Sequence, residues 1–359
     1  MSYSSAIIPL LYLREAMHDF YSDTKSIPTK AMLESIVSAP LGDEQKGEDP
    51  TTAALESRVA EMLGKEAAVF MISGTMCNEI AVKVHCQPGD EVICDETSHL
   101  LNFECGSPAA ISGVVMRPLQ GKNGIFSADD VRNAIRPESR YMPVSKLLLV
   151  EQTANLGGGA VWPLETIDAV VNEAKSHGLI AHMDGARLLN AVAKTGIDPA
   201  RYARDFDSVW IDFSKGLGAP CGAVLAGSAD FCRQAWRQKQ ALGGAMRQSG
   251  VLAAASLYAL DNNIEQQALD NALAASIGER IQQLPQVAHM HPVETNIIIF
   301  DVAAEAPTAA EIVEQLKQRG VLLGAFGERR LRIVTCLNVN EASGDSLVAE
   351  LTALLAGGN

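Results

Sequence analysis

The chain carries few basic residues for its length. Its 359 residues include 29 Lys and Arg against 43 Asp and Glu, which gives a formal net charge of −14. Nucleic acids and anionic membranes are bound by basic faces, so this balance excludes both as main partners. A phosphorylated small molecule is still allowed, because it needs only a local cluster of hydrogen-bond donors.

The seven cysteines lack any pairing pattern. Their number is odd, and no two of them form a Cys-x-x-Cys. We therefore expect neither structural zinc, nor any other metal, nor a disulfide framework. Scattered cysteines in an apolar-rich chain are typical of a reducing compartment, so we expect a cytoplasmic protein in which the cysteines are small buried side chains.

A long hydrophobic run is also missing. The apolar stretch Ala6–Leu13 is short, contains Pro9 and has no basic residue before it. It is a poor signal peptide and is too short to span a bilayer. We interpret residues 1–18 as an N-terminal extension, with Met17 as an alternative start of the protein.

Short apolar runs do alternate with longer amphipathic stretches. This alternation predicts βαβ units and an α/β fold with a mainly parallel central sheet. After Met246 the pattern changes to long helices and a few strands, which predicts a large domain over 19–250 and a smaller α+β domain over 251–359. The predicted strands are Ala67–Met71, Glu91–Cys94, Gly113–Arg117, Lys146–Glu151, Leu179–Met183, Ser208–Phe213 and Ala223–Ala226, followed by Thr295–Asp301, Val321–Leu323 and Arg330–Cys336.

A lysine follows one of the buried strands directly, in Ser214-Lys215-Gly216-Leu217-Gly218. Lysine is among the residues least often buried, and the two glycines allow a sharp turn and the close approach of a ligand. One interpretation of Lys215 is a solvated lysine at a strand end. The other is a Schiff-base lysine in an apolar surround.

Asp184 ends another apolar strand, in His182-Met183-Asp184-Gly185-Ala186-Arg187. One helix and one strand fit between Asp184 and Lys215, which predicts that both lie at the same edge of the sheet. An aspartate there can pair with a protonated pyridine nitrogen of pyridoxal 5'-phosphate (PLP). By itself, Asp-Gly is more often a simple turn.

Two further sites follow strands. Ser73-Gly74-Thr75 opens a helical pattern, whose free N–H groups are suited to a phosphate but also fit a plain helix cap. His99 could stack on a pyridine ring or move a proton, although a lone histidine is more often a packing residue. Arg247, after two glycines, and Arg332, within an apolar strand, are candidates for anion binding or simply outward-facing side chains.

With these pieces in order, the chain resembles the threonine aldolases (low-specificity L-threonine or L-allo-threonine aldolases). These are PLP-dependent aldehyde-lyases of the aspartate-aminotransferase-like fold, fold type I. The resemblance runs from about Asp19 to Leu337. It is carried by Tyr21-Ser22-Asp23-Thr24, Gly42-Asp43, Gly47-Glu48-Asp49-Pro50-Thr51, Gly64-Lys65-Glu66-Ala67-Ala68, Ser73-Gly74-Thr75, Asp184-Gly185-Ala186-Arg187, Ser214-Lys215-Gly216-Leu217-Gly218 and Met246-Arg247-Gln248.

The resemblance implies a role for each of these residues. Lys215 would hold PLP as a Schiff base, and Asp184 would pair with its ring nitrogen. Gly74 and Thr75 would bind the phosphate, with Arg247 reaching it from a neighbouring subunit of a homodimer or homotetramer. His99 would stack on the ring and act as the base. Arg187 would lie against the cofactor and, with Ser22 and Arg332, hold the substrate carboxylate.

The implied reaction is retro-aldol cleavage of an L-β-hydroxy-α-amino acid to glycine and an aldehyde. Another PLP reaction on this fold, transamination or β-elimination, would use Lys215 and Asp184 equally well. A non-catalytic relative should have lost one of these two residues. A plain NAD-binding fold is excluded, because no Gly-x-Gly-x-x-Gly follows the first strand.

Two positions depart from the family pattern on the substrate side. Ala154 stands where a histidine is common, in Glu151-Gln152-Thr153-Ala154-Asn155, and Lys46 stands where an active-site tyrosine is common. We expect Ala154 to open room in the site and Lys46 to add an anion contact. Both changes favour a larger or acidic β-hydroxy amino acid as substrate.

Overall fold

The computed structural model describes residues 17–356. Its largest element is a seven-stranded sheet with the order β2-β8-β7-β6-β5-β3-β4. Five neighbouring strands run parallel, and β8 is antiparallel to both β2 and β7. The predicted α/β fold with a mainly parallel sheet is confirmed. The strands are β2 (Ala67–Met71), β3 (Glu91–Asp95), β4 (Val115–Leu119), β5 (Ser145–Glu151), β6 (Ile180–Gly185), β7 (Ser208–Asp212) and β8 (Ala223–Gly227).

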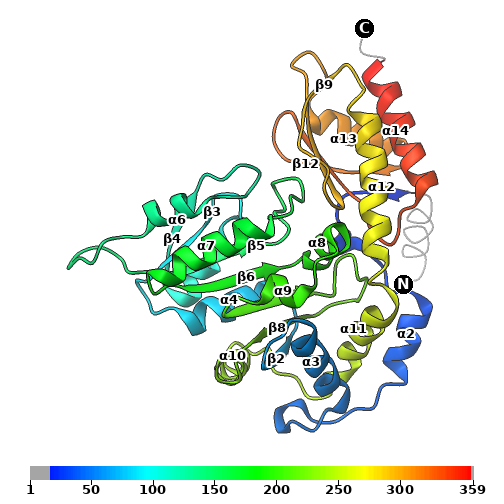
Figure 1. The fold of residues 1–359 in the computed structure, drawn as a ribbon. Coiled ribbons are helices and arrows are strands. Elements are labelled where there is room, and N and C mark those ends of the chain that lie inside the picture. Colours follow the sequence, from blue (N-terminus) through cyan, green and yellow to red (C-terminus); the bar gives the residue numbers. More distant parts are fainter. Residues whose placement is uncertain (1–16, 357–359) are drawn as a thin grey trace, which may run out of the picture.

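Helices cover both faces of this sheet (Figure 1). Alternate residues of a strand point to opposite faces, so Val69 and Met71 pack under one helical layer while Phe70 packs under the other. The first layer holds α4 (Gly74–His85) and α10 (Ala229–Ala241). The second holds α3 (Pro50–Met62), α6 (Ala128–Ala134), α7 (Leu164–Ser176), α8 (Leu188–Thr195), α9 (Pro199–Ala203) and α11 (Gly250–Asn262), and α2 (Lys30–Val37) packs on α11.

A second core lies around a four-stranded antiparallel sheet with the order β12-β13-β10-β9. Helices α12 and α14 lie side by side against it, with α13 nearby (Figure 1). The elements are β9 (Val287–Met290), β10 (Ile297–Val302), β11 (Val321–Leu322), β12 (Gly324–Ala325), β13 (Arg330–Val334), α12 (Gln266–Ile281), α13 (Ala309–Gln318) and α14 (Glu341–Ala356).

The predicted domain boundaries at residues 18 and 250 do not coincide with the two cores. The residues just after 18 pack in the second core, and the helix that begins at residue 250 packs in the first. Strand β1 (His18–Asp19) pairs in parallel with β11, and Phe20 is fully buried in the second core. Helix α11, which begins at Gly250, contributes Ala253 and Ala259 to the first core. The division at 18 and 250 stays a prediction, but the chain enters the second core before it builds the first.

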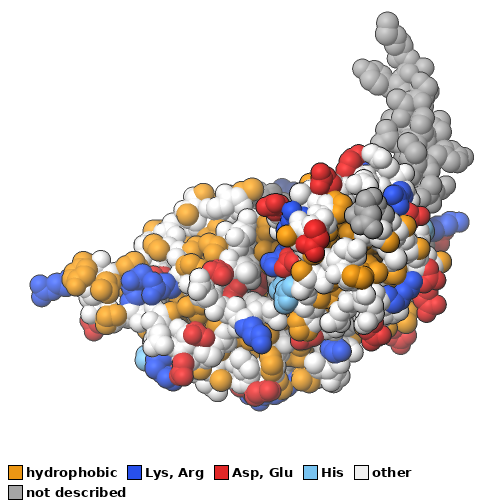
Figure 2. Space-filling view, turned by 90° about the horizontal axis from the view of Figure 1, so that it is seen from above, with side chains coloured by type: hydrophobic (Ala, Val, Ile, Leu, Met, Phe, Trp, Pro, Cys, Tyr) orange, Lys and Arg blue, Asp and Glu red, His pale blue; other side chains and the backbone are white. Residues whose placement is uncertain are grey.

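The surface carries charges of both signs. Acidic and basic side chains of the described residues are interspersed over the face in Figure 2.

Five cysteines are buried, but Cys105 is exposed and Cys221 half-buried, so the expectation of seven buried cysteines is wrong. Within residues 17–356, no helix combines the length and apolar character needed to cross a membrane, and no three His, Cys, Asp or Glu side chains form a group suited to a metal ion.

Candidate active site

A cleft of about 200 Å³ lies at the carboxyl ends of β5, β6 and β7. Ligands of open parallel sheets bind at this edge. Six of the predicted site residues line it together: Gly74, Thr75, His99, Asp184, Arg187 and Lys215. The other lining residues are Thr24, Ser73, Glu104, Glu151, Asn155, Ala186, Trp210, Asp212 and Ser214.

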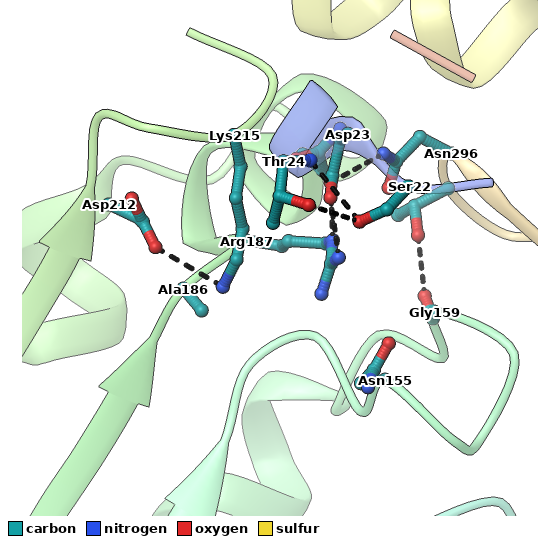
Figure 3. Close-up of polar contacts among 12 residues, drawn as sticks. Ser22, Asp23, Thr24, Asn155, Gly159, Ala186, Arg187, Asp212, Lys215 and Asn296 are labelled. Carbon is teal, nitrogen blue, oxygen red and sulfur yellow. Dashed lines mark hydrogen bonds and ion pairs between the residues drawn. The ribbon is translucent and has the colours of Figure 1, made fainter. Parts of the chain in front are cut away.

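Lys215 extends into the cleft from the loop after β7 (Figure 3). Its side chain is only 15% exposed, and Nζ lies 3.2 Å from Asp212 Oδ2. Asp212 Oδ1 accepts hydrogen bonds from the backbone N–H and the hydroxyl of Ser214, which shapes the turn. A Cβ on Gly216 would lie 2.6 Å from the buried side-chain amide of Gln267, so a side chain here would require that amide to move.

Asp184 is the penultimate residue of β6, and β6 neighbours β7 in the sheet. Its side chain is buried. Oδ1 accepts from the backbone N–H of Ala186 at 3.0 Å, and Oδ2 accepts from Asn78 Nδ2 at 2.9 Å. The structure confirms the predicted placement of Asp184 and Lys215 at one edge of the sheet.

The first turn of α4 forms another wall of the cleft. Ser73 caps the helix by accepting from the backbone N–H of Met76. The N–H groups of Gly74 and Thr75 have no helical partner one turn earlier and line the cleft. A Cβ on Gly74 would lie 2.3 Å from the ring of Trp210, so a side chain here would clash with the indole.

His99 begins the short helix α5 (His99–Asn102). Its Nδ1 lies 2.8 Å from Glu104 Oε1, and its backbone N–H donates to Glu151 Oε2 at 2.6 Å. Burial lowers the pKa of His99, but the hydrogen bond with Glu104 and the charge of Asp184 outweigh burial and raise it. Burial, together with the charge of Asp184, raises the pKa of Glu151 to about 7.

Arg187 forms a buried two-point ion pair with Asp23, with Nε at 2.7 Å and Nη2 at 2.8 Å (Figure 3). Burial alone would raise the pKa of Asp23, but the charge and hydrogen bonds of Arg187 lower it to about 2. Ser22 accepts from the backbone N–H and the hydroxyl of Thr24, so it shapes the turn that presents Asp23. Sequence reasoning missed Asp23 as the partner of Arg187.

Arg332 lies behind the cleft rather than on its wall. On β13, its Nη1 donates to Asn155 Oδ1 at 3.1 Å and its Nη2 to the carbonyl of Tyr21 at 3.3 Å. Among the described residues, Arg332 Nε has no hydrogen-bond partner. Burial and the charge of Arg187 lower the pKa of Arg332 to about 10.

Three positions lie away from this cleft. Arg247 is exposed and pairs with Asp43 at 3.0 Å. Lys46, at the end of the 3₁₀ turn Glu44–Lys46, is exposed and does not line the cleft. Ala154 is buried with its Cβ against Gly124 and Gly157. The expectation that Ala154 opens room in the site is therefore wrong, because Asn155 lines the cleft instead.

Sequence reasoning also missed Asn78, Glu104 and Asp212. Two of the three had a weak signal in the sequence. Asn78 stands one helical turn after Thr75, and Asp212 ends an apolar strand three residues before Lys215. Glu104 had none, because its position five residues after His99 fits no regular helical contact.

The comparisons with known proteins agree with this geometry. Residues 19–305 match the family model described as beta-eliminating lyase. The low-specificity L-threonine aldolase of Escherichia coli K12 is 37% identical over 341 residues, covering 95% of this chain and 100% of that protein. The solved threonine aldolase of Leishmania major superposes with a TM-score of 0.80 at 21% identity, over 94% of this chain and 99% of that one.

A more distant structure also has this fold. A protein named SPT, solved with PLP, superposes with a TM-score of 0.71 at 16% identity, covering 95% of this chain and 87% of that one. The fold type I architecture expected from the resemblance is confirmed.

Proposed function

The chain belongs to the threonine aldolases of the beta-eliminating lyase family, and from this premise we propose that it cleaves an L-β-hydroxy-α-amino acid to glycine and an aldehyde. L-threonine, L-allo-threonine and phenylserine are the candidate substrates. One observation carries the proposal: Lys215 and Asp184 meet in one cleft beside the first turn of α4. That arrangement supplies an amine, a carboxylate and an anion site within one small space.

The residues of the cleft fit PLP. The Gly74 position, closed to any side chain by Trp210, brings backbone N–H groups to a phosphate at the positive end of α4. Asp184 is a buried carboxylate open to the cleft, suited to hold a proton at the ring nitrogen. Lys215 Nζ would be the covalent attachment point. When bound, PLP supplies the electron sink that accepts the bonding electrons from Cα.

Arg187 lines the cleft with a donor left for the substrate carboxylate, and Arg332 lies behind it. Asp23 occupies Arg187 Nε and Nη2, which leaves Nη1 for a ligand. Asn155 and Tyr21 hold Arg332, whose Nε remains unused among the described residues. Anchoring the carboxylate sets which bond at Cα is aligned for cleavage. Ser22 acts here through the Asp23 turn.

His99 is proposed as the base for the β-hydroxyl proton. Glu104 accepts from Nδ1–H, so Nε2 is the nitrogen that can take a proton. Glu104 then stabilises the imidazolium that forms. Departure of the proton from the hydroxyl accompanies breakage of Cα–Cβ and release of the aldehyde, and a proton returned to Cα completes glycine.

The test is product analysis. Purified protein with PLP is incubated with L-threonine, L-allo-threonine and L-threo-phenylserine, and glycine and aldehyde are quantified. We expect both products in equal amounts, and none from Lys215→Ala. Lys194→Ala, in the exposed last turn of α8, is the matched control and should behave as wild type. Retained PLP with no glycine would instead favour transamination or β-elimination.

We also propose a homodimer or homotetramer in which Arg247 completes a neighbouring site. The exposure of Arg247 and its distance from its own cleft support this arrangement. Mixing the inactive variants Lys215→Ala and Arg247→Ala should restore about a quarter of wild-type activity, because half of random dimers carry one intact site. No recovery after subunit exchange would contradict it. The unpaired cysteines support a cytoplasmic location.

A further inference from the structure

Asn78 is a fully buried polar side chain at the centre of the structure, one helical turn into α4. It lies directly behind the cleft but does not line it. Its amide contacts Trp210, His182, Asp184 and Glu104. Burying such a group is costly unless its bonds are satisfied, and all four contacts are hydrogen bonds.

The orientation of this amide is set by chemistry. Trp210 Nε1 can only donate, and it lies 2.7 Å from Asn78 Oδ1. The carbonyl oxygen must therefore face Trp210. His182 Nε2, 3.2 Å from the same oxygen, then carries its ring proton there. A flipped amide would set its NH₂ against the indole N–H and its oxygen against two carboxylates.

A hydrogen-bonded row behind His182 holds this arrangement. His182 Nδ1 accepts from the hydroxyl of Ser208 at 2.7 Å, and Ser208 Oγ accepts from His85 Nε2 at 2.8 Å. Burial lowers the pKa of His182 to about 3 and that of His85 to about 4. Both rings are therefore neutral near pH 7, so each has one donor and one acceptor, as the row requires.

The NH₂ end of Asn78 serves two acids. Asn78 Nδ2 donates to Asp184 Oδ2 at 2.9 Å and to Glu104 Oε1 at 2.8 Å. Glu104 Oε1 also lies 2.8 Å from Nδ1 of His99. One amide thus links the carboxylate assigned to the cofactor ring with the carboxylate that orients the proposed base. Two carboxylates this close repel each other, and a shared donor offsets the repulsion.

We propose that Asn78 is a positioning residue that keeps the carboxylate of Asp184 aimed at the cofactor ring while it orients the Glu104–His99 pair. This proposal rests on the proposed function, because it gives Asp184 the ring nitrogen as its partner. Asn78 touches neither substrate nor cofactor, so its effect reaches the reaction through Asp184 and Glu104.

The test uses holoenzyme and a readout other than activity. Protein loaded with PLP is dialysed at a series of pH values, and the visible absorbance that remains gives the midpoint of cofactor loss on acidification. The charged side chains that share the cleft with Asp184 are unchanged in every variant: His99, Glu104, Glu151, Arg187, Asp212 and Lys215. A shift of the midpoint therefore reports on the Asn78 contact.

In Asn78→Ala, Asp184 loses one hydrogen-bond donor, so its carboxylate is held less firmly against the cofactor and the cofactor is lost at higher pH. We expect the midpoint to rise by about one pH unit, the size of one hydrogen bond to a charged group. Asn78→Asp keeps the shape but adds a third carboxylate, and its midpoint should rise further. Asn271→Ala, a buried amide bonded to Asn190 on α8, should match wild type.

The possible outcomes separate the two proposals. Folded Asn78 variants with the wild-type midpoint overturn the role of Asn78, even if their melting temperatures fall. If neither Asn78 variant folds, His182→Phe decides, because it removes a donor that orients the amide from a residue that does not line the cleft. It should raise the midpoint by a smaller amount, and an unchanged midpoint would overturn the role. Wild-type protein that binds no PLP at any pH overturns the proposed function itself.

Discussion

At the residue scale, Asp23 neutralises and orients the buried guanidinium of Arg187, and the sequence pattern did not reveal this pairing. The two residues are 164 positions apart, and both are buried in a two-point ion pair. A buried guanidinium without its partner is strongly unfavourable, and its side chain would turn toward water. The proposed binding of a substrate carboxylate by Arg187 therefore depends on Asp23.

We predict that Asp23→Asn raises KM for the amino acid by roughly 10- to 100-fold, the equivalent of one charged hydrogen bond, with a smaller effect on kcat. Steady-state kinetics and a melting curve check this. Asp301→Asn is the matched control, because Asp301 pairs with Arg330 in the same two-point geometry outside the cleft. An unchanged KM in Asp23→Asn would show that Arg187 does not hold the carboxylate.

Asp270 on α12 is a buried carboxyl group whose pKa is raised, whereas the pKa of Asp23 is lowered. One carboxylate oxygen of Asp270 has no partner among the described residues, and burial raises the pKa of this group to about 7. Because its folded pKa lies above its unfolded value, the folded state binds the extra proton. The contribution of Asp270 to stability is therefore most favourable below about pH 4 and is lost as pH rises toward about 7.

We predict that Asp270→Asn stabilises the protein at pH 8 by on the order of 2 kcal/mol, with the gain vanishing near pH 4. Urea unfolding at the two pH values measures it. Asp345→Asn, largely exposed beside Arg280, should change stability little at either pH. A gain of equal size at both pH values would argue against titration of Asp270 as the cause.

At the scale of elements, Asp49 joins three segments. It caps α3 by accepting from the backbone N–H of Thr52, and its carboxylate also accepts from those of Gly42 and Gly250. Gly250 begins α11, so one side chain ties the starts of two helices. These three hydrogen bonds lower the pKa of Asp49, although burial opposes them.

Asp49→Ala should cost about 3 kcal/mol of unfolding free energy, since it removes a cap and two further bonds. Ser127→Ala, which removes the capping box of α6 at the surface, should cost about 1 kcal/mol. Denaturant unfolding of both variants provides the comparison. Equal losses would mean that the contacts beyond the α3 cap contribute nothing.

The strands were predicted well because apolar, β-branched runs between polar segments are a local signal. The direction of β8 was not predicted, because this strand runs antiparallel to both of its neighbours, β2 and β7. The segment between β7 and β8 holds the Lys215 loop and no helix, and parallel neighbours need a longer crossover. β8 therefore turns back beside β7. Strand β4 begins at Val115 rather than at Gly113, because Gly113 adopts a left-handed conformation with φ 71°.

At the scale of the whole molecule, the start of the described chain fastens the second core to the site. Phe20 N–H donates to the carbonyl of Leu322, and the carbonyl of Phe20 accepts from Val334. Its ring is fully buried in the second core, and Ser22 and Asp23 follow directly. Removal of the Phe20 ring would therefore destabilise the second core and displace Asp23, the partner of Arg187.

Phe20→Ala should therefore lower stability by about 3–5 kcal/mol and raise KM for the amino acid as well. Tyr141→Ala, at an 86% exposed aromatic position, should change neither. Thermal unfolding and steady-state kinetics test both effects. A stability loss with an unchanged KM would separate the second core from the site.

The sequence alone was enough to predict the α/β class, most strands and helices, and the meeting of Lys215, Asp184, Gly74, Thr75 and His99 at one sheet edge. It could do so because these features depend on local patterns and on the rule that parallel strands end together. The packing of the folded chain set the rest: Arg187 faces Asp23, Asn155 rather than Ala154 lines the cleft, and Arg247 lies outside the cleft. Side-chain direction and contacts between distant segments are set by packing, which no short stretch of sequence contains.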